Sequence, residues 1–131
     1  LLVFSVGINA TAQIATSSTT NSGATASAIG LQTTASVVAS TAMGRETEAS
    51  GNYSTAMGYL TNADGGSSIA MGRQTLANAL YSTAMGYLTT ASGESSSSMG
   101  YQTTASGDYS TALGYLTVAR YPQQVPSPSS L

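Results

Sequence analysis

Hydrophobic and polar positions along the chain follow one pattern that repeats every 14 residues, with the consensus S-T-A-M-G-Y-x-T-x-A-S-G-x-Y. Its glycines keep this spacing without insertion or deletion and are Gly30, Gly44, Gly58, Gly72, Gly86, Gly100 and Gly114. The apolar residues directly before them are Ile29, Met43, Met57, Met71, Met85, Met99 and Leu113. So strict a register indicates stacked structural repeats, because an insertion would break the pairing of one coil with both of its neighbours.

The glycine content decides between helix and strand. A period of 14 equals two heptads, but heptads need large apolar residues at their a and d positions. Each unit carries one or two glycines, and glycine destabilises a helix by about 1 kcal/mol per site. The runs Ser-Thr-Ala-Met-Gly-Tyr and Tyr-x-Thr-x-Ala alternate as strands do, and we expect two glycine-permitted turns to join them. The sequence therefore predicts an all-β fold, a parallel β-roll or β-solenoid of 14-residue coils about 4.8 Å apart.

The same alternation predicts which side chains face inward. Alanine, serine and the threonine three residues after each glycine would fill a thin interior, and the methionine and tyrosine rows would face outward. An outward apolar ladder from Ile29 to Leu113 is too hydrophobic to be left in water. We therefore expect this ladder to form the interface of a homotrimer, a closed arrangement that buries it against copies of itself.

Composition excludes several classes of function. Only 6% of the residues are charged, the net charge is −2, and the basic residues are Arg45, Arg73 and Arg120. A nucleic-acid partner or a basic membrane-binding helix needs a cationic footprint, so we expect neither nucleic-acid binding nor direct membrane contact. The chain has no His or Cys, and its serines have no candidate base. We predict no catalytic residue, no metal site, no cofactor and no enzymatic activity.

The five carboxylates fit turn positions better than a catalytic or calcium-binding cluster. They are Glu46, Glu48, Asp64, Glu94 and Asp108.

Both ends depart from the repeat. Residues 1–12 are apolar and end in Ala10-Thr11-Ala12, which predicts the end of a truncated signal peptide; a buried strand that opens the fold is the alternative. Residues 13–22 are expected to form a degenerate lead-in coil, and residues 23–119 the seven repeat coils. Residues 120–131 hold all three prolines, which predicts a disordered tail or a truncated linker.

The repeat resembles the head repeat of YadA-like trimeric autotransporter adhesins, S-V-A-I-G-x-x-S-x-A-x-G-x-x. The segments that carry the resemblance are Ser54-Thr55-Ala56-Met57-Gly58-Tyr59-Leu60-Thr61-Asn62-Ala63-Asp64-Gly65 and residues 110–119, and it extends over residues 23–119. Thr replaces Val, Met replaces Ile, and Thr replaces the second Ser. The resemblance implies a left-handed β-roll that trimerises on a bacterial outer membrane. It also implies an extracellular ligand, such as collagen, another matrix protein or a cell surface.

Two rows of tyrosine are candidates for ligand contact, because Tyr and Arg often anchor binding surfaces. The first row follows the repeat glycines and consists of Arg45, Tyr59, Arg73, Tyr87, Tyr101 and Tyr115. The second row occurs in alternate coils and consists of Tyr53, Tyr81 and Tyr109. The alternative for each row is that neighbouring rings stack along the ladder and protect the sheet.

Two further functions compete with adhesion. One is a spacer or fibre segment, without a ligand of its own, in a secreted or phage protein that ends in a chaperone-type domain. The other is ice binding through an ordered threonine ladder, which requires that ladder to face outward. Because the repeat threonines share a strand face with the interior alanines, the pattern argues against ice binding.

Overall fold

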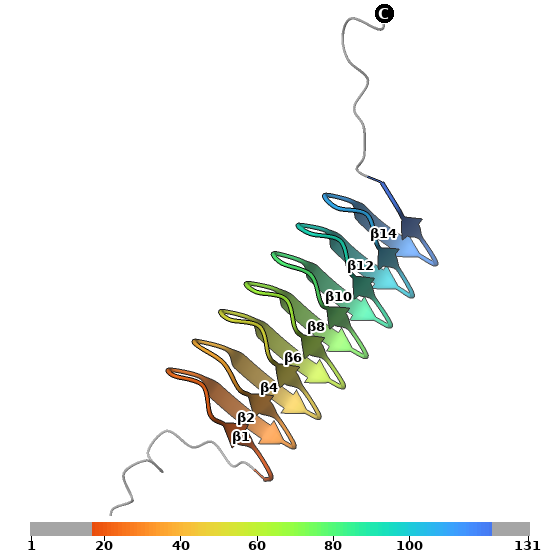
Figure 1. Cartoon of the computed structure of the whole chain (residues 1–131). Coiled ribbons are helices and arrows are strands. Elements are labelled where there is room, and N and C mark those ends of the chain that lie inside the picture. The colour runs from red at the N-terminus through yellow and green to blue at the C-terminus, as the bar shows by residue number, and fades with distance from the viewer. Residues whose placement is uncertain (1–16, 122–131) are drawn as a thin grey trace, which may run out of the picture.

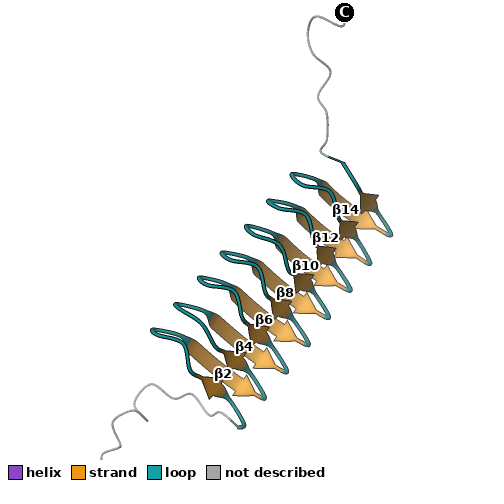
Figure 2. Cartoon of the chain, viewed as in Figure 1, coloured by secondary structure: helices purple, strands orange, loops and turns teal. Residues whose placement is uncertain are grey.

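The computed structural model describes residues 17–121, which form a straight stack of coils with one parallel sheet on each side (Figure 1). Strands and turns account for all of this range, and it contains no helix that could cross a membrane (Figure 2). The all-β solenoid prediction is confirmed. The signal-peptide prediction for residues 1–12 lies outside the described residues, as does all but the start of the predicted tail.

Each coil contributes one five-residue strand and one two-residue strand. The five-residue strands form a seven-stranded sheet of β2 (Ser27–Leu31), β4 (Thr41–Arg45), β6 (Thr55–Tyr59), β8 (Ile69–Arg73), β10 (Thr83–Tyr87), β12 (Ser97–Tyr101) and β14 (Thr111–Tyr115). The two-residue strands form an eight-stranded sheet of β1 (Thr20–Asn21), β3 (Thr34–Ala35), β5 (Glu48–Ala49), β7 (Asn62–Ala63), β9 (Leu76–Ala77), β11 (Thr90–Ala91), β13 (Thr104–Ala105) and β15 (Val118–Ala119).

Every strand pairs in parallel with the strand one coil away, so residues 14 apart in sequence lie side by side. Met57 pairs with Met71, and Ala63 pairs with Ala77. The pairing continues through the turns, where the Leu60 amide donates to the Arg45 carbonyl at 3.0 Å. Like residues are therefore stacked in columns along the rod.

The interior between the two sheets holds only small side chains. Ala56 and Ala63 are fully buried, as is Ser54, and Thr61 is 1% exposed. Threonine is the largest side chain that is fully buried among the described residues. The predicted inward placement of alanine, serine and threonine is confirmed, and it contradicts the outward threonine ladder that ice binding requires.

Steric fit, more than hydrogen bonding, selects the interior residues. Most of the buried threonine hydroxyls have no hydrogen-bond partner within residues 17–121, namely those of Thr33, Thr47, Thr61, Thr75, Thr89 and Thr117. Thr103 differs, because its hydroxyl lies 2.8 Å from that of Ser98, which occupies a position that other coils give to alanine. A serine at this position can thus satisfy the threonine of its own coil.

The prediction that glycines provide the turn conformations is wrong. The left-handed residues of the two turns are non-glycine in every coil; examples are Leu60 with φ 57° and Ser67 with φ 55°. Hydrogen bonds to the preceding coil hold these conformations, such as the one from the Ser67 amide to the Asn52 carbonyl at 2.7 Å. The repeat glycines serve close approach instead: a Cβ on Gly58, which has φ 130°, would lie 1.9 Å from the carbonyl oxygen of Gly72.

Candidate functional site

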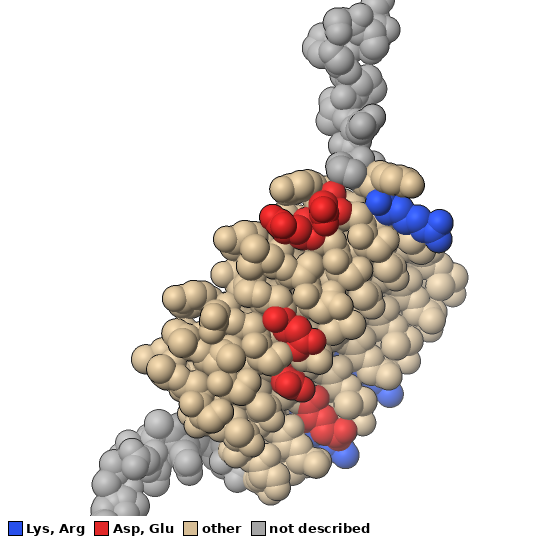
Figure 3. Space-filling view, in the orientation of Figure 1, with Lys and Arg blue, Asp and Glu red and all other residues tan. Residues whose placement is uncertain are grey.

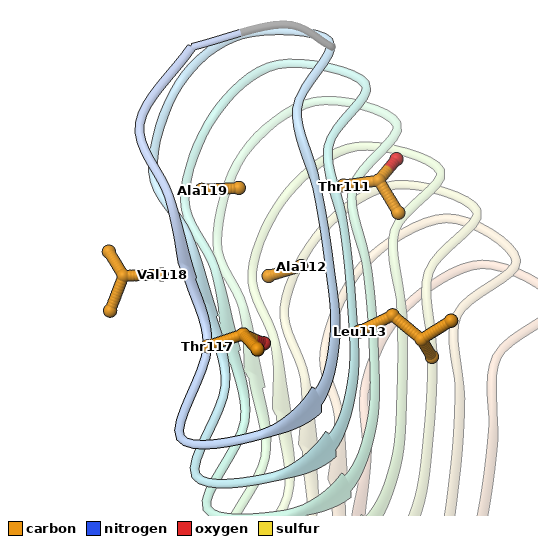
Figure 4. Close-up of a pocket in the computed structure, with 6 residues that line it drawn as sticks. All are labelled: Thr111, Ala112, Leu113, Thr117, Val118 and Ala119. Carbon is orange, nitrogen blue, oxygen red and sulfur yellow. The ribbon is translucent and has the colours of Figure 1, made fainter.

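The flattened coil has two edges with different turns. At the tight edge, two residues join the five-residue strand to the short strand, as residues 60–61 join β6 to β7. At the wide edge, five residues join the short strand to the next coil, as residues 64–68 join β7 to β8. Figure 4 shows the tight turn of the last coil beyond Leu113 and Thr117, and the wide edge of the stack lies on the opposite side, beyond Thr111.

The predicted trimer ladder lies on the outer face of the seven-stranded sheet. Its members, from Ile29 to Leu113, occupy the central position of each five-residue strand and form one continuous column. Most are half-buried against one another, whereas Met43 is 37% exposed and Leu113, in the last coil, is 67% exposed. The structure thus places the ladder on an accessible face, and its role as a trimer interface stays a prediction.

The first tyrosine row, here called the strand row, runs along the tight edge as an unbroken stack. Tyr87 and Tyr101 are stacked with ring centroids 5.1 Å apart, and so are Tyr101 and Tyr115. The Arg73 guanidinium lies between two rings, 5.6 Å from that of Tyr59 and 5.5 Å from that of Tyr87. Each such contact stabilises an exposed site by about 0.5–1 kcal/mol. The stacking interpretation is therefore confirmed for this row.

Arg45 extends the strand row by one coil and is paired with a carboxylate. Its guanidinium lies 5.4 Å from the Tyr59 ring, and its Nε donates to Glu46 Oε1 at 2.8 Å. Arg73 has Gln74 at the position of Glu46, and no salt bridge to Arg73 is present within residues 17–121. The two arginines thus differ in stacking, with one ring for Arg45 and two for Arg73, and in charge pairing.

The second tyrosine row, here called the turn row, lies along the wide edge and has no such contacts. Tyr53, Tyr81 and Tyr109 are 64%, 57% and 63% exposed and have φ values of 62°, 60° and 60°. None of them stacks on another aromatic ring of the described part of the chain. The stacking interpretation is wrong for this row, because rings in alternate coils are too far apart. The sequence already indicates this separation, because successive tyrosines of the row are 28 residues, or two coils, apart.

The acidic side chains follow one face of the rod, with basic side chains beside them at the margin. Figure 3 shows the acidic side chains on the face that it presents and the basic ones toward its margin. Asp64 accepts a hydrogen bond from the Ser50 hydroxyl, and Asp108 Oδ1 accepts one from the Glu94 amide at 2.9 Å. Within the described range, no three His, Cys, Asp or Glu side chains are grouped so that they could hold a metal ion.

A hollow at the C-terminal end of the stack is the exposed end of the interior. Its lining residues are Thr111, Ala112, Leu113, Thr117, Val118 and Ala119. Figure 4 shows Ala112, Thr117 and Ala119 pointing between the strands, as their equivalents do in every coil that is covered by the next. The hollow is therefore the uncovered interior of the last coil. It contains no chemical group that the interior of the other coils lacks.

Comparison with known families agrees with this geometry. The model of the YadA head domain repeat, which spans two copies, matches residues 22–47, 38–61, 63–89 and 91–117. The chain belongs to the YadA head repeat family. Comparison with curated proteins and with solved structures found no match. YadA head repeats and the β-solenoid fold are structural and not enzymatic, which agrees with the lack of a catalytic group in the pattern.

Proposed function

We propose that this chain is the surface-exposed head module of a trimeric autotransporter adhesin and mediates bacterial adhesion to host matrix or to other cells. The observation that carries the proposal is the continuous apolar ladder on the outer face of a YadA head repeat solenoid. Localisation at the bacterial outer membrane and an extracellular partner follow from the same proposal. The binding surface would be built from the repeats, with the strand row as one candidate.

A single coil stack buries little apolar surface, which favours association into a trimer. Its interior contains no side chain larger than threonine among those that are fully buried, and burial of small side chains contributes little hydrophobic free energy. Burial of the methionine column between copies would supply the hydrophobic free energy that the interior lacks, since full burial of one Met side chain contributes about 1.5–3 kcal/mol. Three copies can place the same face on a common axis, and such a closed arrangement covers the ladder of every copy.

Sedimentation equilibrium of the 131-residue chain tests the assembly. We expect three times the monomer mass of 13.1 kDa. Met71→Asp would bury a charge in the proposed interface and should lower the mass toward that of a monomer. Thr90→Asp, on the outer face of the eight-stranded sheet, is the matched control and should leave the trimer intact. A wild-type chain that sediments as a monomer would contradict the proposal.

Display of the chain on a non-adherent bacterium tests adhesion. Adherence to surfaces coated with matrix proteins, collagen among them, should exceed adherence to albumin and should be lost with Met71→Asp but not with Thr90→Asp. A stable trimer that gives no adherence to matrix or to cells would instead support the spacer or fibre function.

A further inference from the structure

Arg45 and Arg73 occupy the same position of the strand row, two coils apart, but only Arg45 has a carboxylate partner within residues 17–121. The next residue is Glu46 in one coil and Gln74 in the other. Both of these turn residues have a left-handed backbone, with φ 55° and 56°, so the two sites differ in the side chain and not in the turn. Arg73 is exposed and keeps a positive charge that no salt bridge in the described range offsets.

Two aromatic rings hold the Arg73 guanidinium in place. Tyr59 lies in the preceding coil and Tyr87 in the following one, with ring centroids 5.6 Å and 5.5 Å from the Arg73 Cζ atom. Rings on both faces leave the N–H groups at the edge of the planar guanidinium available for hydrogen bonds. Because the side chain is already ordered, less conformational entropy is lost when it binds a partner. Arg73 is thus preorganised as a charged hydrogen-bond donor.

Among the described residues, the two coils next to Arg73 carry no negative charge at the tight edge. The equivalent residues 59–60 and 87–88 are tyrosine and leucine in both coils. Three of the five carboxylates lie in wide-edge turns instead and are Asp64, Glu94 and Asp108. The positive charge at this point of the tight edge therefore favours an anionic partner.

The chain itself shows which anion fits an arginine at this position. At Arg45 it is a side-chain carboxylate, which accepts a hydrogen bond from Nε at 2.8 Å while the guanidinium stays over the Tyr59 ring. We propose that Arg73 binds an Asp or Glu side chain of the extracellular protein partner, in the place that Glu46 takes at Arg45. Hydrogen bonds between a guanidinium and a carboxylate are among the strong ones, because both groups are charged. This assignment rests on the proposed function, since it names the chemistry of the partner.

The number of available arginines favours an acidic protein side chain over a sulfated glycan. A polyanionic chain is held by several cations along its length, whereas the described part of the tight edge offers only Arg73. Arg120 lies at the wide edge, and no ring of the described residues lies over it. Tyrosine and arginine together are typical of protein–protein contacts. An unpaired charge is costly to bury between subunits, so we expect the tight edge to remain accessible in the proposed trimer.

Four variants of the full chain exchange the properties of the two sites. Arg73→Gln removes the charge, and Gln74→Glu gives Arg73 an internal carboxylate while leaving its stacking in place. Arg45→Gln changes the net charge by the same amount as either of these but removes an arginine that is already paired. Glu46→Gln frees Arg45. Circular dichroism and thermal unfolding would show that all four variants keep the fold.

Fluorescence anisotropy with labelled poly-L-glutamate measures the site at low salt, and the neutral poly(N-hydroxyethyl-L-glutamine) is the control polymer. We expect the wild-type chain to bind poly-L-glutamate in preference to the neutral polymer. Arg73→Gln and Gln74→Glu should bind it at least five-fold more weakly, Arg45→Gln should bind it as the wild type does, and Glu46→Gln should bind it about two-fold more tightly. General attraction between charges predicts equal losses for Arg45→Gln and Arg73→Gln, and that result would overturn the proposal. A wild-type chain that does not bind poly-L-glutamate would overturn it as well.

Two further measurements separate the choice of partner and the proposed adhesion from the Arg73 site. Binding of heparin that depends on Arg73, with binding of poly-L-glutamate that does not, would overturn the choice of a protein carboxylate. On displayed chains, Gln74→Glu should reduce adherence to matrix-coated surfaces and Arg45→Gln should not. Adherence that Gln74→Glu leaves unchanged would contradict the role of Arg73 while adhesion itself stands. Selective poly-L-glutamate binding by a chain that adheres to no surface would instead contradict the proposed adhesion.

Discussion

The tight and wide edges of the coil use the same side chain in opposite ways. In the strand row the tyrosine rings occupy successive coils or alternate with arginine, and each contacts its neighbours within 5–6 Å. In the turn row the rings occupy alternate coils, remain mostly exposed and adopt left-handed backbone conformations. On a solenoid, then, the interval between aromatic residues separates a ring that supports the fold from one that is free to contact a partner.

The largest effect is expected at a glycine that lies against the backbone of the next coil. We expect Gly58→Ala at the tight edge to lower the free energy of unfolding by more than about 3 kcal/mol. The new Cβ would lie 1.9 Å from a backbone carbonyl oxygen, and pairing with the next coil holds that oxygen in place. Gly66→Ala at the wide edge should change it by less than about 1 kcal/mol, because its nearest atom is the Cδ1 of the flexible Leu80 side chain. Denaturant unfolding at fixed protein concentration measures both.

A substitution at Gly114 distinguishes the two causes of the destabilisation expected at Gly58, namely close approach between coils and backbone strain. Gly114 has the same kind of backbone conformation, with φ 114°, but its Cβ would meet only the Thr117 side chain at 3.9 Å. Gly114→Ala should therefore show only the conformational strain, of order 1–3 kcal/mol. Equal losses for Gly58→Ala and Gly114→Ala would show that close approach between coils is not the main cause of the destabilisation.

A tyrosine within the strand row should contribute measurably to stability. Tyr101→Ser removes two stacked contacts at 5.1 Å and should lower the free energy of unfolding by about 1–2 kcal/mol. Tyr115→Ser removes one contact of a ring that is 67% exposed, and a smaller loss is expected. Thermal unfolding of the two variants side by side checks the order, and equal losses would show that the stack is unimportant.

A tyrosine of the turn row should contribute almost nothing to stability. Tyr81→Ser places at this position the residue that the neighbouring coils already have, and we expect a change within about 0.5 kcal/mol. A loss as large as that of Tyr101→Ser would show that the turn row supports the fold and would remove the distinction between the two edges.

The smallest effect is expected at the ion pair of the tight edge. Glu46→Gln removes an exposed salt bridge at 2.8 Å and leaves the stacking of Arg45 on Tyr59, so the free energy of unfolding should fall by only a few tenths of a kcal/mol. A measurement at low and high salt would show the screening expected of surface charges, and no salt dependence would argue against an electrostatic contribution.

The sequence predicts those parts of the fold that depend on the period of the repeat. An unbroken spacing of 14 requires parallel pairing of equivalent residues, and alternation along Thr55–Tyr59 separates the buried Ala56 from the outward Met57. The left-handed turn residues could not be predicted, because Leu60 and Ser67 have no intrinsic preference for that conformation and hydrogen bonds from the adjacent coil impose it. The division of the tyrosines into two rows was readable in their spacing, but only the structure shows which row is free.

Hydroxyl-radical footprinting with mass spectrometry tests the central claim most directly, namely that the methionine ladder faces other subunits while the turn row stays accessible. We expect Met57, Met71 and Met85 of the wild-type chain to be protected from oxidation. Tyr53, Tyr81 and Tyr109 should be modified readily. The Met71→Asp variant provides the reference for an unassembled ladder, since it should expose Met57 and Met85 to the reagent. Oxidation of these two methionines at the same rate in both proteins would contradict the account.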